Sequence, residues 1–243
     1  MVLAVIPARF ASTRFPGKPL VMIQGKSMVQ RVYEQVLQVP NIQEVWVATD
    51  DARILEHVQG FGGKAVLTRT DHPSGTDRCA EVCRLFPEAE WVLNIQGDEP
   101  FVQPEQVQRL LQTIQSSSAG IATLAKKITD FNLLSNPNTV KVVFNQSGHA
   151  LYFSRHPIPF VRGSEPADWL ESGLHYKHIG LYGFRRSALL DITQLPTSRL
   201  ETAESLEQLR WLDNGYSIQV GLTELETIGI DTPEDLERVA SIS

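Results

Sequence analysis

The sequence predicts an α/β fold built on a mostly parallel sheet with helices on both faces. Short runs of β-branched and aliphatic residues alternate with helical patterns over the first hundred residues. The helical stretches are about ten residues long, as in crossovers between parallel strands. At 243 residues, with 42% hydrophobic and 21% charged residues, the chain can bury one good-sized core. Ligands of such sheets bind beyond the carboxyl ends of the strands, near a switch in strand order.

The first hundred residues contain four expected strands and three expected helices. The strands are Leu3–Ile6, Val45–Thr49, Lys64–Leu67 and Trp91–Ile95. The first helix starts after Ser27, a good N-cap, and its apolar positions Val29, Val32 and Val36 recur at helical spacing. The other two helices are Asp51–Gly60, closed by its glycine, and Thr76–Phe86.

The pattern changes after residue 120. A hairpin is expected from Thr139–Phe144 and His149–Phe153, joined by a turn at Asn145–Gly148. The stretch Pro157–His178 is irregular, typical of a long loop or a small insertion. A helix over Glu201–Asn214, a short strand over Thr227–Ile230 and a helix starting in Asp231–Val239 complete the expected elements.

Composition excludes several classes of protein. The net charge of −6 and pI near 5.5 disfavour a general nucleic-acid binder, which needs a surplus of Lys and Arg. No apolar run approaches the roughly 20 residues that span a bilayer, and the apolar start Met1–Ile6 is too short for a signal peptide. The only cysteines, Cys79 and Cys83, form no disulfide framework. We therefore expect a soluble, cytoplasmic protein.

A basic segment follows the first expected strand. Ile6–Leu20 contains Arg9, Arg14 and Lys18 with hydroxyl residues and glycine, and no acidic residue. Cations, hydroxyls and flexible backbone so close together favour an anion-binding loop. The spacing matches neither a Walker A loop nor a dinucleotide fingerprint. The alternative is a solvated basic surface loop.

Two aspartates are candidates for a metal site. Asp98 lies in Asn94–Pro100, at the end of the fourth strand, where it would face the basic segment. A carboxylate facing phosphates requires a divalent cation between them, and Mg²⁺ uses one or two carboxylates plus phosphate oxygens. Asp231 follows another expected strand and could be the second carboxylate. The alternatives are an ordinary turn for Asp98 and a helix cap for Asp231.

A third segment, Thr68–Asp77, follows the third strand and precedes a helix. Its hydroxyls, its backbone N–H groups and Arg69 could contact a base, a ribose or a phosphate. The alternative is an ordinary strand-to-helix connection. Together, the three segments favour metal-assisted phosphoryl chemistry on a nucleotide, but they do not identify a second substrate.

Eight colinear segments resemble one family, the 3-deoxy-manno-octulosonate cytidylyltransferases or CMP-KDO synthetases. They are IPARFASTRFPGKPL (6–20), ATDD (48–51), PSGTDR (73–78), NIQGDEP (94–100), ALYFSRHPIP (150–159), HIGLYGF (178–184), LETAESLEQLR (200–210) and IDTPEDL (230–236). Related sugar-activating enzymes share a basic loop of this kind, so the specificity of the resemblance comes from all eight in order. The least familiar region is Val161–Lys177.

The resemblance implies a Rossmann-like nucleotidyltransferase fold and, usually, a homodimer. The implied reaction joins CTP to 3-deoxy-D-manno-octulosonate (KDO), giving CMP-KDO and pyrophosphate, with Mg²⁺ as cofactor. The product serves lipopolysaccharide assembly in Gram-negative bacteria. We expect a single nucleotidyltransferase domain. Residues 1–120 and 225–243 should form its nucleotide-binding core, and about residues 121–224 should bind the sugar and make the dimer contacts.

The resemblance also implies roles for individual residues. Arg9 and Lys18 should hold the triphosphate, with Ala8, Arg69, Ser74 and Gln96 contacting the nucleotide. Asp98 and Asp231 should bind Mg²⁺ and, with Arg9 and Lys18, form the catalytic set. The sugar site should contain Arg155, His178, Tyr182, Glu207 and Gln208. Two alternatives remain open: another acid sugar, either sialic acid or an 8-amino analogue of KDO, and a nucleotide-sensing module without turnover.

Overall fold

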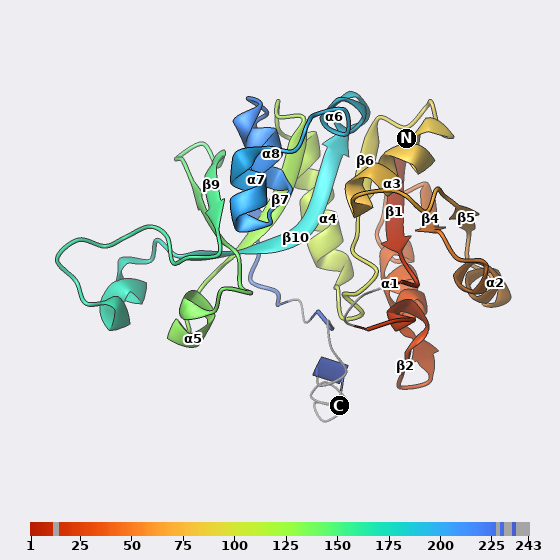
Figure 1. Ribbon diagram of the computed structural model, residues 1–243, viewed down its shortest axis with the longest axis horizontal. Coiled ribbons are helices and arrows are strands. Elements are labelled where there is room, and N and C mark those ends of the chain that lie inside the picture. Colours follow the sequence, from red (N-terminus) through yellow and green to blue (C-terminus); the bar gives the residue numbers. More distant parts are fainter. Residues whose placement is uncertain (12–14, 227–228, 231–234, 237–243) are drawn as a thin grey trace. The chain divides into compact units, whose positions relative to one another are not determined.

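The computed structural model describes residues 1–11, 15–226, 229–230 and 235–236. The chain divides into two compact units (Figure 1). Unit 1 contains residues 1–108 and 227–243, and unit 2 contains residues 109–226. The boundary falls inside helix α4, Pro104–Gln115, which sequence patterning did not predict.

Unit 1 has a fully parallel sheet in the order β6-β1-β4-β5. Its strands are β1 (Val2–Ala8), β4 (Glu44–Thr49), β5 (Ala65–Leu67) and β6 (Trp91–Asn94). All four were predicted. Every residue of β1 from Val2 to Ile6 is buried, so both faces of this strand are covered. The chain visits β1, β4 and β5 in one direction and then returns to β6 on the other side of β1, which makes β1/β6 the switch point of this sheet.

The three predicted crossover helices of unit 1 are present beside these strands (Figure 1). They are α1 (Met28–Leu37), α2 (Ala52–Gly60) and α3 (Gly75–Arg84). Each begins at a side-chain cap, because Ser27, Asp51 and Ser74 accept hydrogen bonds from backbone N–H groups of the first turn. A short hairpin of β2 (Met22–Ile23) and β3 (Lys26–Ser27) and a 3₁₀ turn, Lys18–Leu20, precede α1.

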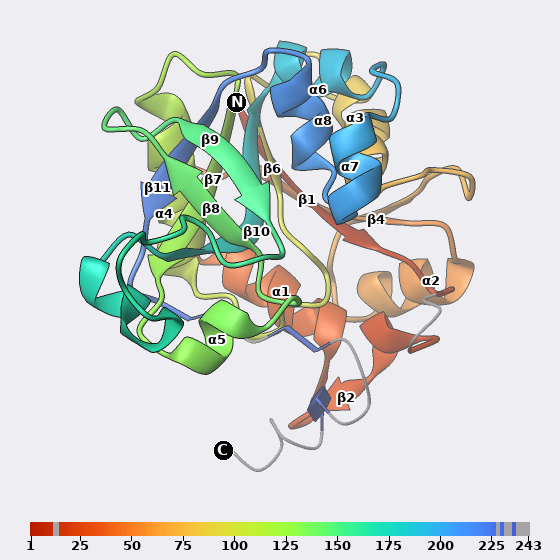
Figure 2. The same ribbon diagram turned by 60° about the vertical axis from the view of Figure 1, so that its left-hand side comes forward.

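Unit 2 has a mixed sheet. Strand β7 (Ile121–Lys127) pairs in parallel with β11 (Ile218–Leu222) and antiparallel with β10 (Tyr176–Arg185). The predicted hairpin is present as β8 (Lys141–Phe144) and β9 (Ala150–Ser154), and β8 also pairs with β10. Figure 2 brings this hairpin to the front, with α7 and α8 nearby. Patterning missed β7, β10 and β11, and it assigned the start of β10 to the irregular stretch Pro157–His178.

The irregular stretch before β10 is a small folded insertion. It contains a 3₁₀ helix, Pro166–Ser172, whose Trp169 is buried and donates its indole N–H to the Ser164 carbonyl. Trp169 packs with Ile128 and with Leu134 of α5 (Phe131–Ser135). This apolar cluster therefore anchors the insertion to the rest of unit 2.

The single helix predicted over Glu201–Asn214 is wrong. After α6 (Arg186–Ile192), the chain forms two short helices, α7 (Arg199–Glu204) and α8 (Gln208–Asp213). Ser205 between them has a φ of 52°, in the left-handed region, which ends α7. Hydrophobic periodicity continues across the break, so patterning alone could not reveal it.

The predictions for the C-terminal segment lie largely outside the described residues. Residues 227–228 and 231–234 are not described, and Gly229 and Ile230 are not in a strand. Ile230 is fully buried in a cluster with Ile23 and Met28. Among the helices of the described residues, none has the length and apolar character needed to cross a membrane.

Candidate functional site

The switch point of the unit 1 sheet brings two predicted site residues together. The basic segment leaves the end of β1, and the turn that contains Asp98 leaves the end of β6, the strand beside β1. Lys18 Nζ lies 2.7 Å from Asp98 Oδ2, although 80 residues separate them. The Lys18 side chain is 10% exposed, and that of Asp98 is 36% exposed. A nearly buried ammonium group thus faces a carboxylate that water can still reach.

Gly97 of the NIQGDEP segment and Gly75 of the PSGTDR segment allow these segments to approach the end of β1 closely. A Cβ on Gly97 would lie 2.8 Å from the Pro7 carbonyl oxygen at the end of β1, which is closer than real Cβ atoms come to backbone. A Cβ on Gly75 would lie 3.3 Å from the Pro7 side chain. The segments that contain Asp98 and Ser74 therefore both pack against the end of β1, which explains why glycine occurs at these positions.

Asp231 lies outside the described residues, so the structure does not test its position. The residue before it is described, however, and Ile230 donates its backbone N–H to the Asp98 carbonyl over 3.1 Å. This backbone hydrogen bond places Ile230 beside Asp98.

The predicted nucleotide contacts all lie at the end of β1 or in the segments that follow β1, β5 and β6 of unit 1. Ala8 is the last residue of β1 and is buried, and Arg9 follows it. Ser74 caps α3, where its hydroxyl accepts from the Asp77 N–H and donates to the Asp77 carboxylate. Gln96 follows β6 in the turn that leads to Asp98. All of these residues lie at or after the carboxyl ends of parallel strands, which lie at the same edge of the sheet.

Arg69 is placed differently from the other predicted nucleotide contacts. It follows β5 and forms an exposed, bidentate ion pair with Asp71, which raises the pKa of Arg69 and lowers that of the Asp71 carboxyl. An exposed pair of this kind contributes little to stability. A nucleotide would have to compete with Asp71 for this guanidinium group.

The donor set at this edge fits a hydrated magnesium ion bound together with phosphates. Mg²⁺ typically takes one or two protein carboxylates, substrate phosphate oxygens and water. Asp98 supplies a water-accessible carboxylate, and the nearby Lys18 can neutralise further phosphate charge. No group of three or more metal-binding side chains occurs among the described residues, so an all-protein cage is not present there.

In unit 2, a β-bulge brings two predicted sugar-site residues close together. His178 of β10 pairs with Ala125, whereas Tyr182 pairs with Thr123, only two residues away on β7. Residues i and i+4 of a regular strand lie about 13 Å apart. Because the bulge absorbs two residues, the rings of His178 and Tyr182 lie 5.5 Å apart instead.

Tyr182 has a buried hydroxyl group. Its side chain is buried, and its hydroxyl has no hydrogen-bond partner among the described residues. Burial, with the charge of Glu207 as a second cause, raises the pKa of Tyr182 well above its usual value. Glu207 is the N-cap residue of α8, and Gln208 is buried in its first turn. A buried hydroxyl without a partner is what a bound ligand could satisfy.

Arg155 follows β9, and its side chain hydrogen-bonds to the segment between α7 and α8. Its Nε, Nη1 and Nη2 donate to the carbonyls of Glu204, Pro137 and Ser205. The Glu204 carboxylate in turn accepts from the Arg155 backbone N–H. A guanidinium group has five N–H donors, so two have no partner among the described residues and could bind a ligand.

Some supporting residues carry no motif that sequence reasoning could have detected. Lys141 is fully buried and donates to the carbonyls of Asn136, Thr139 and Arg155; burial lowers its pKa to about 8. Arg78 of the PSGTDR segment is fully buried and pairs with Asp50 of the ATDD segment. Both segments were recognised in the sequence, but nothing in the sequence indicated that Arg78 and Asp50 pair.

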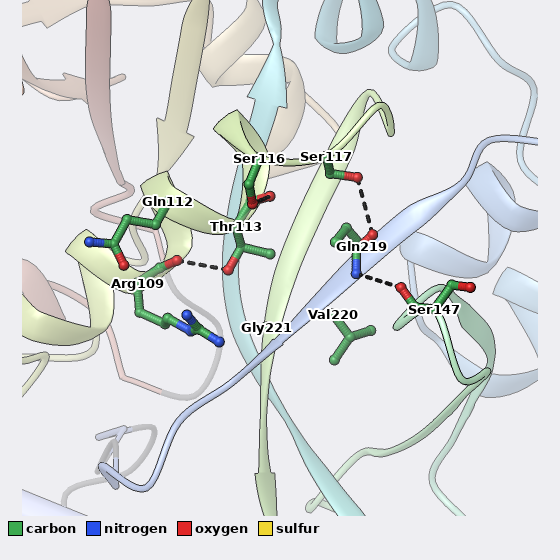
Figure 3. Close-up of a pocket in the computed structure, with 9 residues that line it drawn as sticks. All are labelled: Arg109, Gln112, Thr113, Ser116, Ser117, Ser147, Gln219, Val220 and Gly221. Carbon is green, nitrogen blue, oxygen red and sulfur yellow. Dashed lines mark hydrogen bonds between the residues drawn. The ribbon is translucent and has the colours of Figure 1, made fainter.

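A separate cavity of about 390 Å³ lies in unit 2 (Figure 3). It is lined by Arg109, Gln112, Thr113, Ser116, Ser117, Ser147, Gln219, Val220 and Gly221. None of these nine described residues belongs to the predicted site, and Arg109 is the one ionisable group among them. Because arginine stays protonated in proteins and cannot act as a general acid or base, this cavity is a poor candidate for proton-transfer chemistry.

Comparison with known proteins defines the class first. A family profile described as Cytidylyltransferase matches residues 3–222. A solved structure of a 4-diphosphocytidyl-2C-methyl-D-erythritol synthase from Anaerococcus prevotii matches with a TM-score of 0.66 at 17% identity, over 99% of this chain and 95% of that one. At this identity the likeness shows the fold alone; the class, cytidylyltransferase, comes from the family profile.

More similar relatives define the family within this class. The 3-deoxy-manno-octulosonate cytidylyltransferases of Cytophaga hutchinsonii and Escherichia coli are 55% and 49% identical, over 100% and 98% of this chain and 97% and 94% of their own. A solved CMP:2-keto-3-deoxy-manno-octonic acid synthetase complexed with CTP matches with a TM-score of 0.92 and 47% identity, over 99% and 97% of the two chains. The chain belongs to the 3-deoxy-manno-octulosonate cytidylyltransferase family.

Proposed function

We propose that the chain activates KDO with CTP, giving CMP-KDO and pyrophosphate for lipopolysaccharide assembly. The observation that carries this proposal is the meeting of Lys18 and Asp98 at the β1/β6 switch point, in a chain about half identical to relatives named for this activity. The solved relative that contains CTP supports the choice of nucleotide.

The mechanism that we propose is direct in-line displacement. The anomeric hydroxyl of KDO attacks the α-phosphorus of CTP and loses its proton to solvent, a P–O bond forms, and the bond to pyrophosphate breaks. No covalent enzyme intermediate is needed, so the work of the protein is positioning and charge stabilisation. Lys18 and Arg9 bind the triphosphate and stabilise the charge of the leaving pyrophosphate. Ala8, Arg69, Ser74 and Gln96 orient the rest of the nucleotide.

Asp98 and Asp231 would hold Mg²⁺. When bound, the ion supplies charge neutralisation and orientation of the phosphates. In the structure, Lys18 and Asp98 neutralise each other at 2.7 Å. A triphosphate would draw the Lys18 ammonium to its own oxygens and leave the Asp98 carboxylate for the cation. The ion pair therefore places a cation for the triphosphate and a carboxylate for the metal ion at the proposed triphosphate site.

The sugar would bind in unit 2. Arg155 is suited to the KDO carboxylate, because a guanidinium group pairs with a carboxylate bidentately. The unsatisfied Tyr182 hydroxyl, with Glu207 near it, supports a site for sugar hydroxyls. His178 and Gln208 complete the set. In this proposal unit 1 binds the nucleotide, and unit 2 binds the sugar and forms a homodimer in the cytoplasm.

A substrate panel tests the proposal. Pyrophosphate release is measured with CTP and Mg²⁺ against KDO, its 8-amino analogue and sialic acid. We expect KDO to give the highest kcat/KM. Turnover with another acid sugar and none with KDO would overturn the substrate assignment. CTP binding without release of pyrophosphate with any of the sugars would indicate a nucleotide-sensing module instead.

A further inference from the structure

Thr123 of β7 lies beneath the sugar-site residues and matches no motif. It is fully buried. Its Oγ1 lies 2.8 Å from the Leu181 carbonyl, 3.0 Å from the Ile179 carbonyl and 2.9 Å from His178 Nε2. Both carbonyls belong to the β10 bulge, so one hydroxyl contacts the bulge and the imidazole at the same time.

The chemistry of these three neighbours restricts the proton positions. A hydroxyl has one proton to donate, and a carbonyl oxygen can only accept. If Thr123 donates to a carbonyl, its oxygen can also accept from an N–H at His178 Nε2, and two hydrogen bonds form. If it donates to His178 instead, only one forms, and its oxygen faces two carbonyl oxygens without a proton between them. The first arrangement is therefore favoured.

The imidazole itself is neutral at pH 7. Burial lowers the pKa of His178, whose ring packs against the rings of Phe153 and Tyr182, at 5.0 and 5.5 Å between centroids. A neutral imidazole carries one proton, so a proton on Nε2 leaves the lone pair on Nδ1. His178 as a residue is partly exposed, and no described residue hydrogen-bonds its Nδ1.

We propose that Thr123 is a positioning residue, which holds neutral His178 in its Nε2–H tautomer and so presents Nδ1 as a hydrogen-bond acceptor. The ligand group recognised by Nδ1 is a hydroxyl of the acid sugar; this last step rests on the function proposed above. His178 then serves as an acceptor of defined direction and carries no positive charge. The same hydroxyl of Thr123 fixes the bulge that brings Tyr182 beside His178.

The first test reads the tautomer directly and requires no substrate. Long-range ¹H–¹⁵N spectra of histidine-labelled protein distinguish a protonated from an unprotonated ring nitrogen, and His178→Gln assigns the signals. We expect a protonated Nε2 in the wild type and in Thr123→Ser, and a mixture of tautomers in Thr123→Val. A wild type protonated on Nδ1 would overturn the proposal, whether or not any variant folds.

The second test separates positioning from general damage. We expect Thr123→Val to raise KM for the acid sugar about tenfold, the scale of one lost hydrogen bond, with KM for CTP within about twofold and with rescue in Thr123→Ser. Thr113→Val is the matched control, because Thr113 is also buried and bonded to a carbonyl, that of Arg109. An unchanged sugar KM in Thr123→Val would contradict the role.

The two tests fail in different ways if the proposed function is wrong. The sugar KM is measured with whichever acid sugar the wild type turns over. If KDO is not the substrate, the spectra still decide the tautomer, and the variants still decide the effect on the true sugar. If no sugar reacts at all, the recognition step is overturned, although the spectra still decide the tautomer.

Discussion

Asp98→Asn is expected to lower kcat about a hundredfold or more while the protein stays folded. Loss of one charge-stabilising group in an active site typically has an effect of this size. The amide keeps the shape of the side chain, and its oxygen can still accept from Lys18 Nζ, so the contact at 2.7 Å need not be lost. What disappears is the negative charge that would bind Mg²⁺. Steady-state rates of pyrophosphate release, with circular dichroism for folding, test this.

Asp130→Asn is the matched control for that variant. Asp130 caps α5 by accepting from the Asn132 N–H, and asparagine caps a helix equally well. The same aspartate-to-asparagine change should therefore leave kcat unchanged. Near-normal turnover in Asp98→Asn would remove Asp98 from the mechanism.

Lys18→Met should have the second-largest effect, on both KM for CTP and kcat. A hydrogen bond to a charged group contributes about 1.5–3 kcal/mol, which corresponds to about ten- to a hundredfold in binding. Methionine keeps much of the volume of this nearly buried side chain, and Asp98 remains accessible to water, so the fold should tolerate the change. Initial rates at varied CTP concentration provide the measurement.

Lys26→Met serves as the control for Lys18→Met. Lys26 pairs with Glu34 on the surface, with half of its side chain exposed, and such pairs contribute little. We expect no change in KM or kcat there. If Lys18→Met behaved like Lys26→Met, the proposed role of the basic segment in triphosphate binding would be wrong.

Much of unit 1 could be predicted from sequence because local signals specify it. Ser27, Asp51 and Ser74 are strong helix caps, and all three occupy cap positions. The buried strands are short continuous apolar runs, which patterning detects. The approach of Lys18 to Asp98 followed from one topological rule, that ligands bind where the strand order switches.

Unit 2 was less predictable because long-range contacts determine it. The break between α7 and α8 depends on one residue, Ser205, in a left-handed conformation that its sequence does not require, and the Ser205 carbonyl accepts from Arg155, 50 residues away. Likewise, the β10 bulge depends on pairing with β7, so the proximity of His178 and Tyr182 could not be read from their spacing. Thr123 became visible only once that pairing was known.

When CTP and Mg²⁺ bind, we expect Lys18 and Asp98 to exchange their mutual contact for the triphosphate and the metal ion. A crystal structure of the chain with CTP and Mg²⁺ tests this most directly. We predict Lys18 Nζ bound to a triphosphate oxygen and an Asp98 oxygen about 2.0–2.1 Å from the metal ion. A triphosphate bound away from both side chains, with Lys18 and Asp98 still paired, would contradict the claim.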